Sequence, residues 1–387
     1  MKKTIQDFDL DGKKVIIRCD FNVPMNNGKI EDATRIVASL RTIKYALRNN
    51  AKVILLSHLG KVKTEEDKIS NSLYPVAEKL SSYLDKQVLF SPDTRSSKLT
   101  EMVDNLKDGD VLLIENTRFE DVPGKKETNC DEKLSKYWAS LGDIFINDAY
   151  GTCHRAHASV VGIPKYLPSG VGFLVEKEVQ KLDNILKSDT HPFVAILGGK
   201  KVDDKISLTQ SLLEKCDKLL IGGAMSFTFL KALGYNTGSS IVSDDYVEFA
   251  KEMINKYEDK IVLPVDFVLE TTTKDIKDFN DGDIGYDIGS KSIKLFEKEL
   301  DSARRVIING PMGLFEDVKY QNGTKSIFKY LDKNKIKTLI GGGDSAAAVN
   351  KLGFDDAFYH VSTGGGATIK YIEKGSLVGI DAIEDKS

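Results

Sequence analysis

The feature that most constrains the fold of this chain is a series of short apolar runs that alternate with amphipathic segments. Runs rich in Val, Ile, Leu and Phe and bounded by glycine or polar residues are typical of buried parallel strands. Such runs lie at residues 14 to 21, 52 to 58, 111 to 118, 143 to 150, 192 to 199, 218 to 225, 261 to 267, 305 to 310, 337 to 343 and 357 to 365. The segments between them, such as 33 to 48, 74 to 84 and 324 to 333, are predicted to be crossover helices. The pattern predicts an α/β protein with two doubly wound parallel sheets.

The length of 387 residues exceeds the size at which one hydrophobic core usually keeps growing, so we expect two domains. Two prolines and a glycine in IPKYLPSG, residues 163 to 170, mark a break before an amphipathic segment. We therefore expect an N-terminal domain over 1 to 169, an interdomain helix over 170 to 188 and a second domain from 189.

Composition excludes several classes of protein. No apolar run has the length that is needed to span a bilayer, and the charged N-terminus lacks the apolar core of a secretory signal. The four cysteines form no CxxC pair, so we expect reduced thiols and neither a zinc site nor a disulfide framework. A net charge of −3 argues against general affinity for nucleic acid. We expect a cytoplasmic protein that binds neither nucleic acid nor a membrane.

Polar and cationic residues follow the apolar runs of the N-terminal half, and glycines follow those of the C-terminal half. This contrast matters because open parallel sheets bind ligands beyond the carboxyl ends of their strands. The first set is Asp20, Asn22, His58, Lys61, Arg118, Asp148, His154, Arg155 and His157. The second is Gly198, Gly199, Lys201, Gly222, Gly223, Asn309, Gly310, Gly313 and Gly341 to Gly343. Seven of the nine arginines also precede residue 156, which favours an oxyanion pocket there. We interpret the chain as a phosphotransferase.

The loop GGGDSAAAV, residues 341 to 349, follows an apolar run and opens a helix, so backbone N–H groups and the helix dipole favour a phosphate there. The alternative is that Asp344 or Ser345 simply caps the helix. Asp344 is also a candidate ligand for a magnesium ion that a nucleotide carries. A second triple glycine, 364 to 366, is explained nearly as well by a tight turn.

Two other loops point to a nucleotide. In ILGGKKVDDKI, residues 196 to 206, Lys201 and Lys205 are expected to share one face of the following helix and to bind a polyphosphate. In NGPMGLFE, residues 309 to 316, Glu316 is a candidate for a ribose hydroxyl, although an ordinary turn explains this loop equally well.

Both common nucleotide fingerprints are absent from the sequence, because it contains no GxxxxGK[ST] and no GxGxxG after its early apolar runs. An NAD-dependent dehydrogenase of the same fold class stays open as an alternative, and an absorbance change with NADH would identify it. A second alternative is a non-catalytic phosphate-binding protein. Its expected sign would be loss of Lys201, Arg35 or the GGGDS loop, and all are present.

Taken in order along the chain, the motifs resemble the phosphoglycerate kinase family. They are VIIRCDFNVP (15 to 24), SHLG (57 to 60), LLIENTRFE (112 to 120), NDAYGTCHRAHAS (147 to 159), ILGGKKVDDKI, NGPMGLFE, GGGDSAAAV and VSTGGGAT (361 to 368). The resemblance implies two Rossmann-like domains joined by a helix, with a nucleotide-binding domain over 189 to 366 and a tail over 367 to 387 that returns to the first domain. It also implies a cytoplasmic monomer that acts in glycolysis and gluconeogenesis.

The activity that the resemblance implies is reversible phosphoryl transfer between 1,3-bisphosphoglycerate with ADP and 3-phosphoglycerate with ATP. The nucleotides are bound as Mg²⁺ complexes, and transfer is in line, in a closed interdomain cleft. Arg35 and Lys201 are the implied catalytic residues. The implied phosphoglycerate-binding residues are Asp20, Phe21, Asn22, Arg35, His58, Leu59, Gly60, Lys61, Arg118 and Arg155. The implied nucleotide-binding residues are Lys205, Gly285, Glu316, Gly342, Gly343, Asp344 and Ser345, with Asp344 on the metal.

The sequence departs from the family pattern at two places. After SHLG the family usually has arginine and proline, whereas this chain has Lys61 and Val62. Lysine keeps the charge but lacks the bidentate fork, so direct substrate contact at position 61 is in question. Lys200 replaces a small residue and adds a cation beside Lys201.

Overall fold

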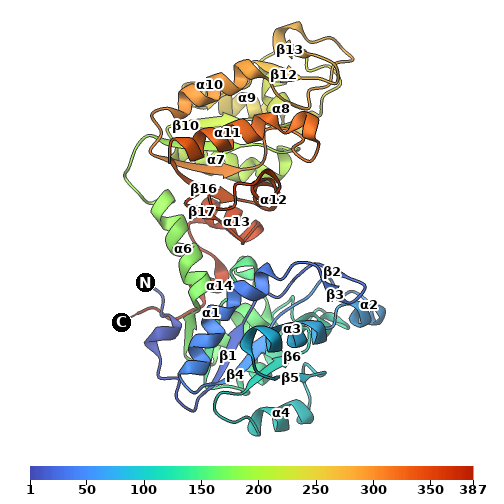
Figure 1. Ribbon diagram of the computed structural model, residues 1–387, viewed down its shortest axis with the longest axis vertical. Helices are drawn as coiled ribbons and strands as arrows, with labels where there is room; N and C mark the ends of the chain where they lie inside the picture. The colour runs from blue at the N-terminus through green and yellow to red at the C-terminus, as the bar shows by residue number, and fades with distance from the viewer. Residues whose placement is uncertain (387) are drawn as a thin grey trace. The chain divides into compact units, whose positions relative to one another are not determined.

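The protein is described by a computed structural model that covers residues 1–386 (Figure 1). The chain divides into two compact units, Met1–Gln180 with the segment that begins at Ser376, and Lys181–Gly375. The sequence predicts an interdomain helix over 170 to 188 and a tail that begins at 367. The first division falls inside helix α6 (Phe173–Leu186), which begins in the first unit and ends in the second, and the second division falls later than predicted. Helix α13 (Gly366–Lys374) packs against helix α7 (Ile206–Lys215) of the second unit.

The first unit contains a six-stranded sheet in which every pair of neighbours is parallel. Its order is β5 (Val88–Ser91), β6 (Val111–Ile114), β4 (Lys52–Leu56), β1 (Lys14–Arg18), β7 (Ile144–Asn147) and β8 (Ser169–Val171). The helices that accompany it are α1 (Thr34–Arg48), α2 (Glu65–Ser70), α3 (Tyr74–Leu84), α4 (Ser97–Asp104), α5 (Glu132–Ala139) and α14 (Val378–Asp381). A two-stranded hairpin, β2 (Met25–Asn26) and β3 (Lys29–Ile30), follows β1. All residues of β6 and β7 are buried, which explains their unbroken apolar sequence.

The second unit contains another six-stranded parallel sheet. Its order is β11 (Ile261–Val262), β10 (Lys218–Ile221), β9 (Phe193–Leu197), β15 (Arg305–Asn309), β16 (Lys337–Gly341) and β17 (His360–Val361). Numbered along the chain, this is the doubly wound order 3-2-1-4-5-6, which reverses between β9 and β15. A small antiparallel sheet joins β13 (Thr273–Asp275), β12 (Asp266–Val268) and β14 (Asp287–Ile288). The remaining helices are α8 (Ser226–Ala232), α9 (Val247–Lys256), α10 (Ser290–Leu300), α11 (Asn322–Lys333) and α12 (Gly343–Leu352).

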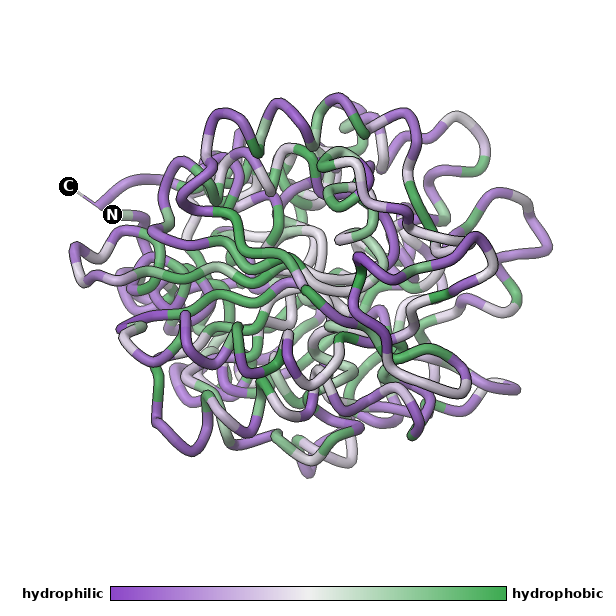
Figure 2. Tube along the Cα trace, turned by 90° about the horizontal axis from the view of Figure 1, so that it is seen from above, coloured by the Kyte–Doolittle hydropathy of each residue, from purple (hydrophilic) through white to green (hydrophobic). Residues whose placement is uncertain are grey.

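The predicted fold class is confirmed, since every predicted apolar run contains a strand of one of the two parallel sheets. Two further strands of the first sheet, β5 and β8, were not predicted. Both are edge strands, and β8 is only Ser-Gly-Val, which begins at the end of the segment that was interpreted as a break. Figure 2 shows apolar stretches along the extended segments and hydrophilic residues on the outer turns. Among residues 1–386, no helix is long and apolar enough to cross a membrane.

A buried charged residue holds each end of α6. In the first unit, Oδ1 of Asp148 accepts hydrogen bonds from the backbone N–H groups of Leu174, at 2.8 Å, and Val175, at 3.4 Å. In the second unit, Arg305 donates Nη1–H to the carbonyl oxygen of Ile185 and Nε–H to that of Thr190. Asp148 stabilises the N-terminus of α6 through these hydrogen bonds, and the positive charge of Arg305 at the C-terminus interacts favourably with the helix dipole.

The Asp148 anchor predicts a pH-dependent stability of the first unit. Burial raises the pKa of Asp148 to about 7, so between about pH 4 and pH 7 the folded chain retains a proton that the unfolded chain has released. The free energy of unfolding of the wild type, relative to Asp148→Asn, should therefore fall as the pH rises through this range and stay level above it. Asparagine keeps an oxygen for the helix cap but does not titrate.

Urea unfolding followed by the fluorescence of Trp138 measures this difference, because Trp138 is the only tryptophan of the chain and is buried in the first unit. Asp85→Asn, at an exposed position of the same unit, is the control for the exchange of a carboxylate for an amide. A pH-independent difference for Asp148→Asn would contradict the prediction.

Candidate functional site

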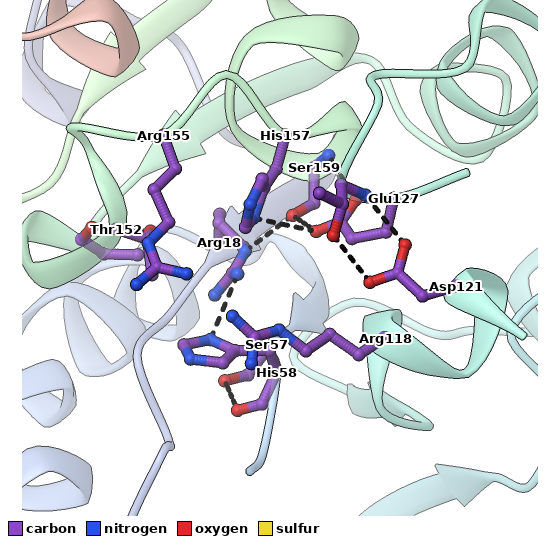
Figure 3. A network of polar contacts seen from close by, with 12 residues as sticks. Arg18, Ser57, His58, Arg118, Asp121, Glu127, Thr152, Arg155, His157 and Ser159 are labelled. Atoms are coloured by element: carbon purple, nitrogen blue, oxygen red, sulfur yellow. Dashed lines mark hydrogen bonds and ion pairs between the residues drawn. The ribbon is translucent and has the colours of Figure 1, made fainter. Parts of the chain in front are cut away.

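Arginines and histidines converge in the first unit near the carboxyl ends of β1 and β4 (Figure 3). Arg18, the last residue of β1, is completely buried, and its Nη2 lies 3.3 Å from Nδ1 of His58. Arg118, in the short helix η2 (Thr117–Asp121), donates Nη1–H to the carbonyl oxygen of Gly60. Repulsion by Arg155 and Arg18, after burial, lowers the pKa of Arg118. The three guanidinium groups are therefore near enough to disfavour one another's positive charge, and a bound anion would relieve this repulsion.

Two histidines of this cluster, His58 and His157, have pKa values far below the ordinary value and are neutral at pH 7. Burial first, and then the neighbouring arginines, hold the pKa of His58 well below its ordinary value. The same causes lower the pKa of His157 to about 3. The positive charge of the pocket therefore comes from arginines, and the histidines contribute hydrogen-bonding groups.

An ion pair and a backbone contact order the loop after β1. Nη1 of Arg35 lies 2.6 Å from Oδ2 of Asp20, and a Cβ atom at Gly151 would come close to the same oxygen. Oδ1 of Asn22 accepts a hydrogen bond from the backbone N–H of Gly60 at 2.8 Å. These residues thus connect the ends of β1 and β4 with the start of α1.

Three of the predicted substrate residues do not present a side chain to this cluster. Phe21 and Leu59 are buried in the hydrophobic core of the first unit, so only their backbones can contribute. The N–H of Phe21 donates to Ser57 Oγ, and that of Leu59 to Asn116 Oδ1. Lys61 is exposed on the loop after Gly60.

The sequence analysis did not identify the buried partners of the cluster, Glu127 and Ser159. Nε–H of Arg18 donates to Ser159 Oγ at 2.8 Å, and Ser159 Oγ–H donates to Glu127 Oε1. A sequence signal existed for Arg18, because it is the only charged residue inside an otherwise apolar part of its strand. Glu127, in the polar segment KKETNC, carries no such signal.

In the second unit, Lys205 lies where the strand order reverses. Its Nζ donates to the carbonyl oxygens of Gly198, at 2.6 Å, and Asn309, at 2.9 Å, the residues at the ends of β9 and β15. Burial lowers its pKa to about 8. The expectation that Lys201 shares a helix face with Lys205 is wrong, since α7 begins only at Ile206 and Lys201 lies in the exposed loop before it.

The loop after β16 begins α12 without a side-chain cap. Gly342 has a φ of +92° and is the N-cap residue, and no side chain accepts a hydrogen bond there. Ser345 is buried, and its Oγ accepts the N–H of Gly310 at 2.6 Å, so its hydroxyl is used within the protein. The capping alternative for Asp344 and Ser345 is therefore not realised, and the first N–H groups of α12 stay available for an anion.

A cavity of about 390 Å³ opens beside these loops within the second unit. Its apolar wall includes Phe227, Ile241, Phe267, Met312 and Leu314, and its polar margin includes Lys200, Glu316 and Asp344. Gly285 also lines it, and a Cβ atom at this position would overlap the ring of Phe227. The cavity thus has an apolar interior with a few polar groups at its rim, the composition of a small-molecule site.

Among residues 1–386, no group of three or more His, Cys, Asp or Glu side chains could hold a metal ion. Mg²⁺ in phosphate sites is usually bound by one or two carboxylates together with substrate phosphates and water. Asp344, exposed on the first turn of α12, fits that arrangement as a single carboxylate ligand.

Two doubly wound parallel sheets, one followed by cations and the other by glycine loops beside a cavity, are features of an α/β enzyme that binds phosphorylated molecules. The family model described as phosphoglycerate kinase matches residues 5–375. The phosphoglycerate kinases of Fusobacterium nucleatum and Enterococcus faecalis are 52% and 51% identical to this chain, with 100% of each chain covered. The structure of phosphoglycerate kinase from Coxiella burnetii superposes with a TM-score of 0.89 at 34% identity, covering 99% of this chain and 98% of the other.

The chain therefore belongs to the phosphoglycerate kinase family, and it is a glycolytic kinase and transferase. The family uses magnesium-bound nucleotides. The family membership agrees with the resemblance that the sequence motifs show.

The close approach of Gly285 to Phe227 predicts that Gly285→Val narrows the cavity. We expect the KM for Mg-ATP to rise about tenfold or more, because the added methyl groups displace either the ring or the ligand. The KM for 3-phosphoglycerate should stay unchanged. Steady-state kinetics measures both, and Gly282→Ala is the control because a Cβ atom there meets nothing within 4 Å. Equal KM values for Mg-ATP in both variants would refute the prediction.

Proposed function

We propose that this chain transfers a phosphoryl group reversibly between 1,3-bisphosphoglycerate with ADP and 3-phosphoglycerate with ATP. The first unit binds the phosphoglycerate and the second binds the nucleotide. The observation that carries the proposal is the arginine cluster of the first unit, in a chain whose second unit has glycine loops and a cavity at the reversal of a 3-2-1-4-5-6 sheet.

The chemistry of this reaction suits the residues that are present. Both the acyl phosphate and ATP have good leaving groups, so the protein needs no strong general base. It has to orient two anions and neutralise the charge on the transferring group. Arginine, lysine and backbone N–H groups supply both the orientation and the positive charge.

We assign the phosphate and carboxylate of 3-phosphoglycerate to Arg118, Arg155, His58 and the loop that carries Asp20 and Asn22. Arg118 and Arg155 supply charge and His58 supplies a neutral hydrogen-bonding group. Gly60, Phe21 and Leu59 are assigned to this site through their backbone atoms only. Lys61 is assigned a supply of charge from an exposed position, because it lacks the bidentate fork of arginine.

On the nucleotide side we assign Gly285 and Glu316 to the nucleoside, since both line the cavity. Lys205, Gly342 and Gly343 are assigned to the phosphates, and Ser345 is assigned to support of the loop through Gly310. Asp344 would hold magnesium together with the phosphates, and the ion would supply charge neutralisation there. Arg35 and Lys201 are assigned to the transferring phosphoryl group as catalytic residues. We further propose a cytoplasmic monomer.

A coupled assay tests the reaction. The chain is supplied with 3-phosphoglycerate and Mg-ATP, together with an enzyme that consumes 1,3-bisphosphoglycerate, and each substrate is omitted in turn. We expect turnover only in the complete mixture. Turnover that does not depend on 3-phosphoglycerate would reject the proposed substrate, and oxidation or reduction of nicotinamide without the coupling enzyme would favour the dehydrogenase alternative.

Magnesium dependence gives a separate prediction. Because the only carboxylate assigned to the metal is Asp344, titration calorimetry should detect no Mg²⁺ binding at this loop until ADP or ATP is present. Asp344→Asn should weaken binding of the Mg-nucleotide more than binding of the metal-free nucleotide. Nucleotide-independent Mg²⁺ binding that Asp344→Asn abolishes would contradict this assignment.

Arg35→Met should lower kcat by orders of magnitude with a smaller change in KM, because the charge of Arg35 is needed mainly in the transition state. Circular dichroism should show an intact fold. Arg35→Lys, which keeps the charge and a partner for Asp20, should lose less activity. Arg48→Met, at an exposed position on the same helix α1, is the control. Near-normal kcat in Arg35→Met would reject the catalytic assignment.

A further inference from the structure

A chain of buried hydrogen bonds ends at His58. It starts at Glu127, whose carboxylate accepts one hydrogen bond from the hydroxyl group of Ser159 and another from the backbone N–H of Ser159, at 3.0 Å. Ser159 Oγ accepts Nε–H of Arg18 at 2.8 Å, and Nη2 of Arg18 lies 3.3 Å from Nδ1 of His58 (Figure 3). The side chains of Arg18, Glu127 and Ser159 are completely buried, so solvent does not compete for these bonds.

The donor and acceptor properties of the groups fix the direction of each hydrogen bond in this series. A guanidinium group has only donors, so Nδ1 of His58 has to be the acceptor and carry no proton. A neutral imidazole has one protonated nitrogen, and that nitrogen is then Nε2. Among residues 1–386, no group bonds to Nε2 of His58, so its N–H is available to a ligand.

We propose that Arg18 is a positioning residue that fixes His58 as the neutral Nε2–H tautomer, so that His58 presents one fixed hydrogen-bond donor to the substrate anion. The inference rests on the proposed function for the identity of that anion. Glu127 and Ser159 orient Arg18, and Glu127 supplies the counter-charge without which burial of the guanidinium would be costly.

The groups around His58 all act against its protonation. Arg18 faces it from β1, Arg118 from η2, Arg35 from α1 and His157 from the loop before Ala158, and each of them lowers its pKa further after burial. Glu127, the buried carboxylate of the cluster, is engaged with Ser159. His58 should therefore stay neutral throughout the range of about pH 5.5 to 8 in which an ordinary histidine titrates.

Nuclear magnetic resonance of histidine-labelled protein tests the tautomer directly in the substrate-free protein. The chain has five histidines, and His58→Gln identifies the signal of His58. We expect ¹⁵N shifts of an unprotonated Nδ1 and a protonated Nε2 that do not change over that pH range. A proton on Nδ1, or titration of the ring within the range, would overturn the inference.

Arg18→Lys tests the positioning role. Lysine keeps the charge beside Glu127, but a single ammonium group cannot reach Ser159 and Nδ1 of His58 in the same geometry. We expect a mixed tautomer signal at His58 and a KM for 3-phosphoglycerate about tenfold higher, with the KM for Mg-ATP unchanged. Arg48→Lys, at an exposed site of the same unit, is the matched control. An unchanged tautomer in folded Arg18→Lys would refute the role of Arg18.

The two levels of inference fail separately. If the tautomer is as expected but His58→Gln leaves the KM for 3-phosphoglycerate unchanged, the assignment of His58 to the substrate fails and the inference about Arg18 stands. If Arg18→Lys does not fold, the tautomer of the wild-type protein still tests the inference, because a proton on Nδ1 would exclude the hydrogen bond from Arg18 to His58.

Discussion

The buried guanidinium of Arg18 is the constraint on which the first unit's site depends. A charge without solvent is tolerated only when a counter-charge and hydrogen bonds compensate it, and Glu127, Ser159 and the carbonyl oxygen of Cys19 provide these. Because those partners come from three separate parts of the chain, the pocket forms only when β1 and the segments around residues 127 and 159 are correctly packed. The geometry of the arginine and histidine cluster is thus coupled to the core beneath it.

The second unit reaches its site by a different route. Here the backbone of neighbouring loops comes so close that a Cβ atom at Gly198, Gly223 or Gly310 would overlap backbone atoms of the next loop. Lys205 bridges the two strand ends across which the sheet order reverses. In the second unit, glycines set the shape of the loops at the strand ends, and the half-buried Lys205 contributes charge. In the first unit, side chains fill the region beyond the strand ends.

The sequence was sufficient for the fold because strands buried on both faces require unbroken apolar runs, and these runs are recognisable without tertiary information. The same reasoning missed the edge strands β5 and β8, because β5 is short and only partly buried and β8 has a single apolar side chain, Val171. Motif residues such as Arg118 and Asp344 were predicted as site residues from their place after strands. Glu127 was not, because its role depends on Arg18, more than a hundred residues away, to which it is linked through Ser159, and a polar segment gives no sign of these partners.

The first unit is not continuous in the sequence. Asn147 donates to the carbonyl oxygen of Gly379, the N–H of Gly379 donates to that of Cys153, and the N–H of Lys3 donates to that of Glu384, so the N- and C-terminal ends lie together (Figure 1). A ribosome releases the chain from its N-terminus. The second unit has all its residues once Gly375 has emerged, whereas the first must wait for the segment beyond it. The half of the molecule that is synthesised first is therefore the last to be completed.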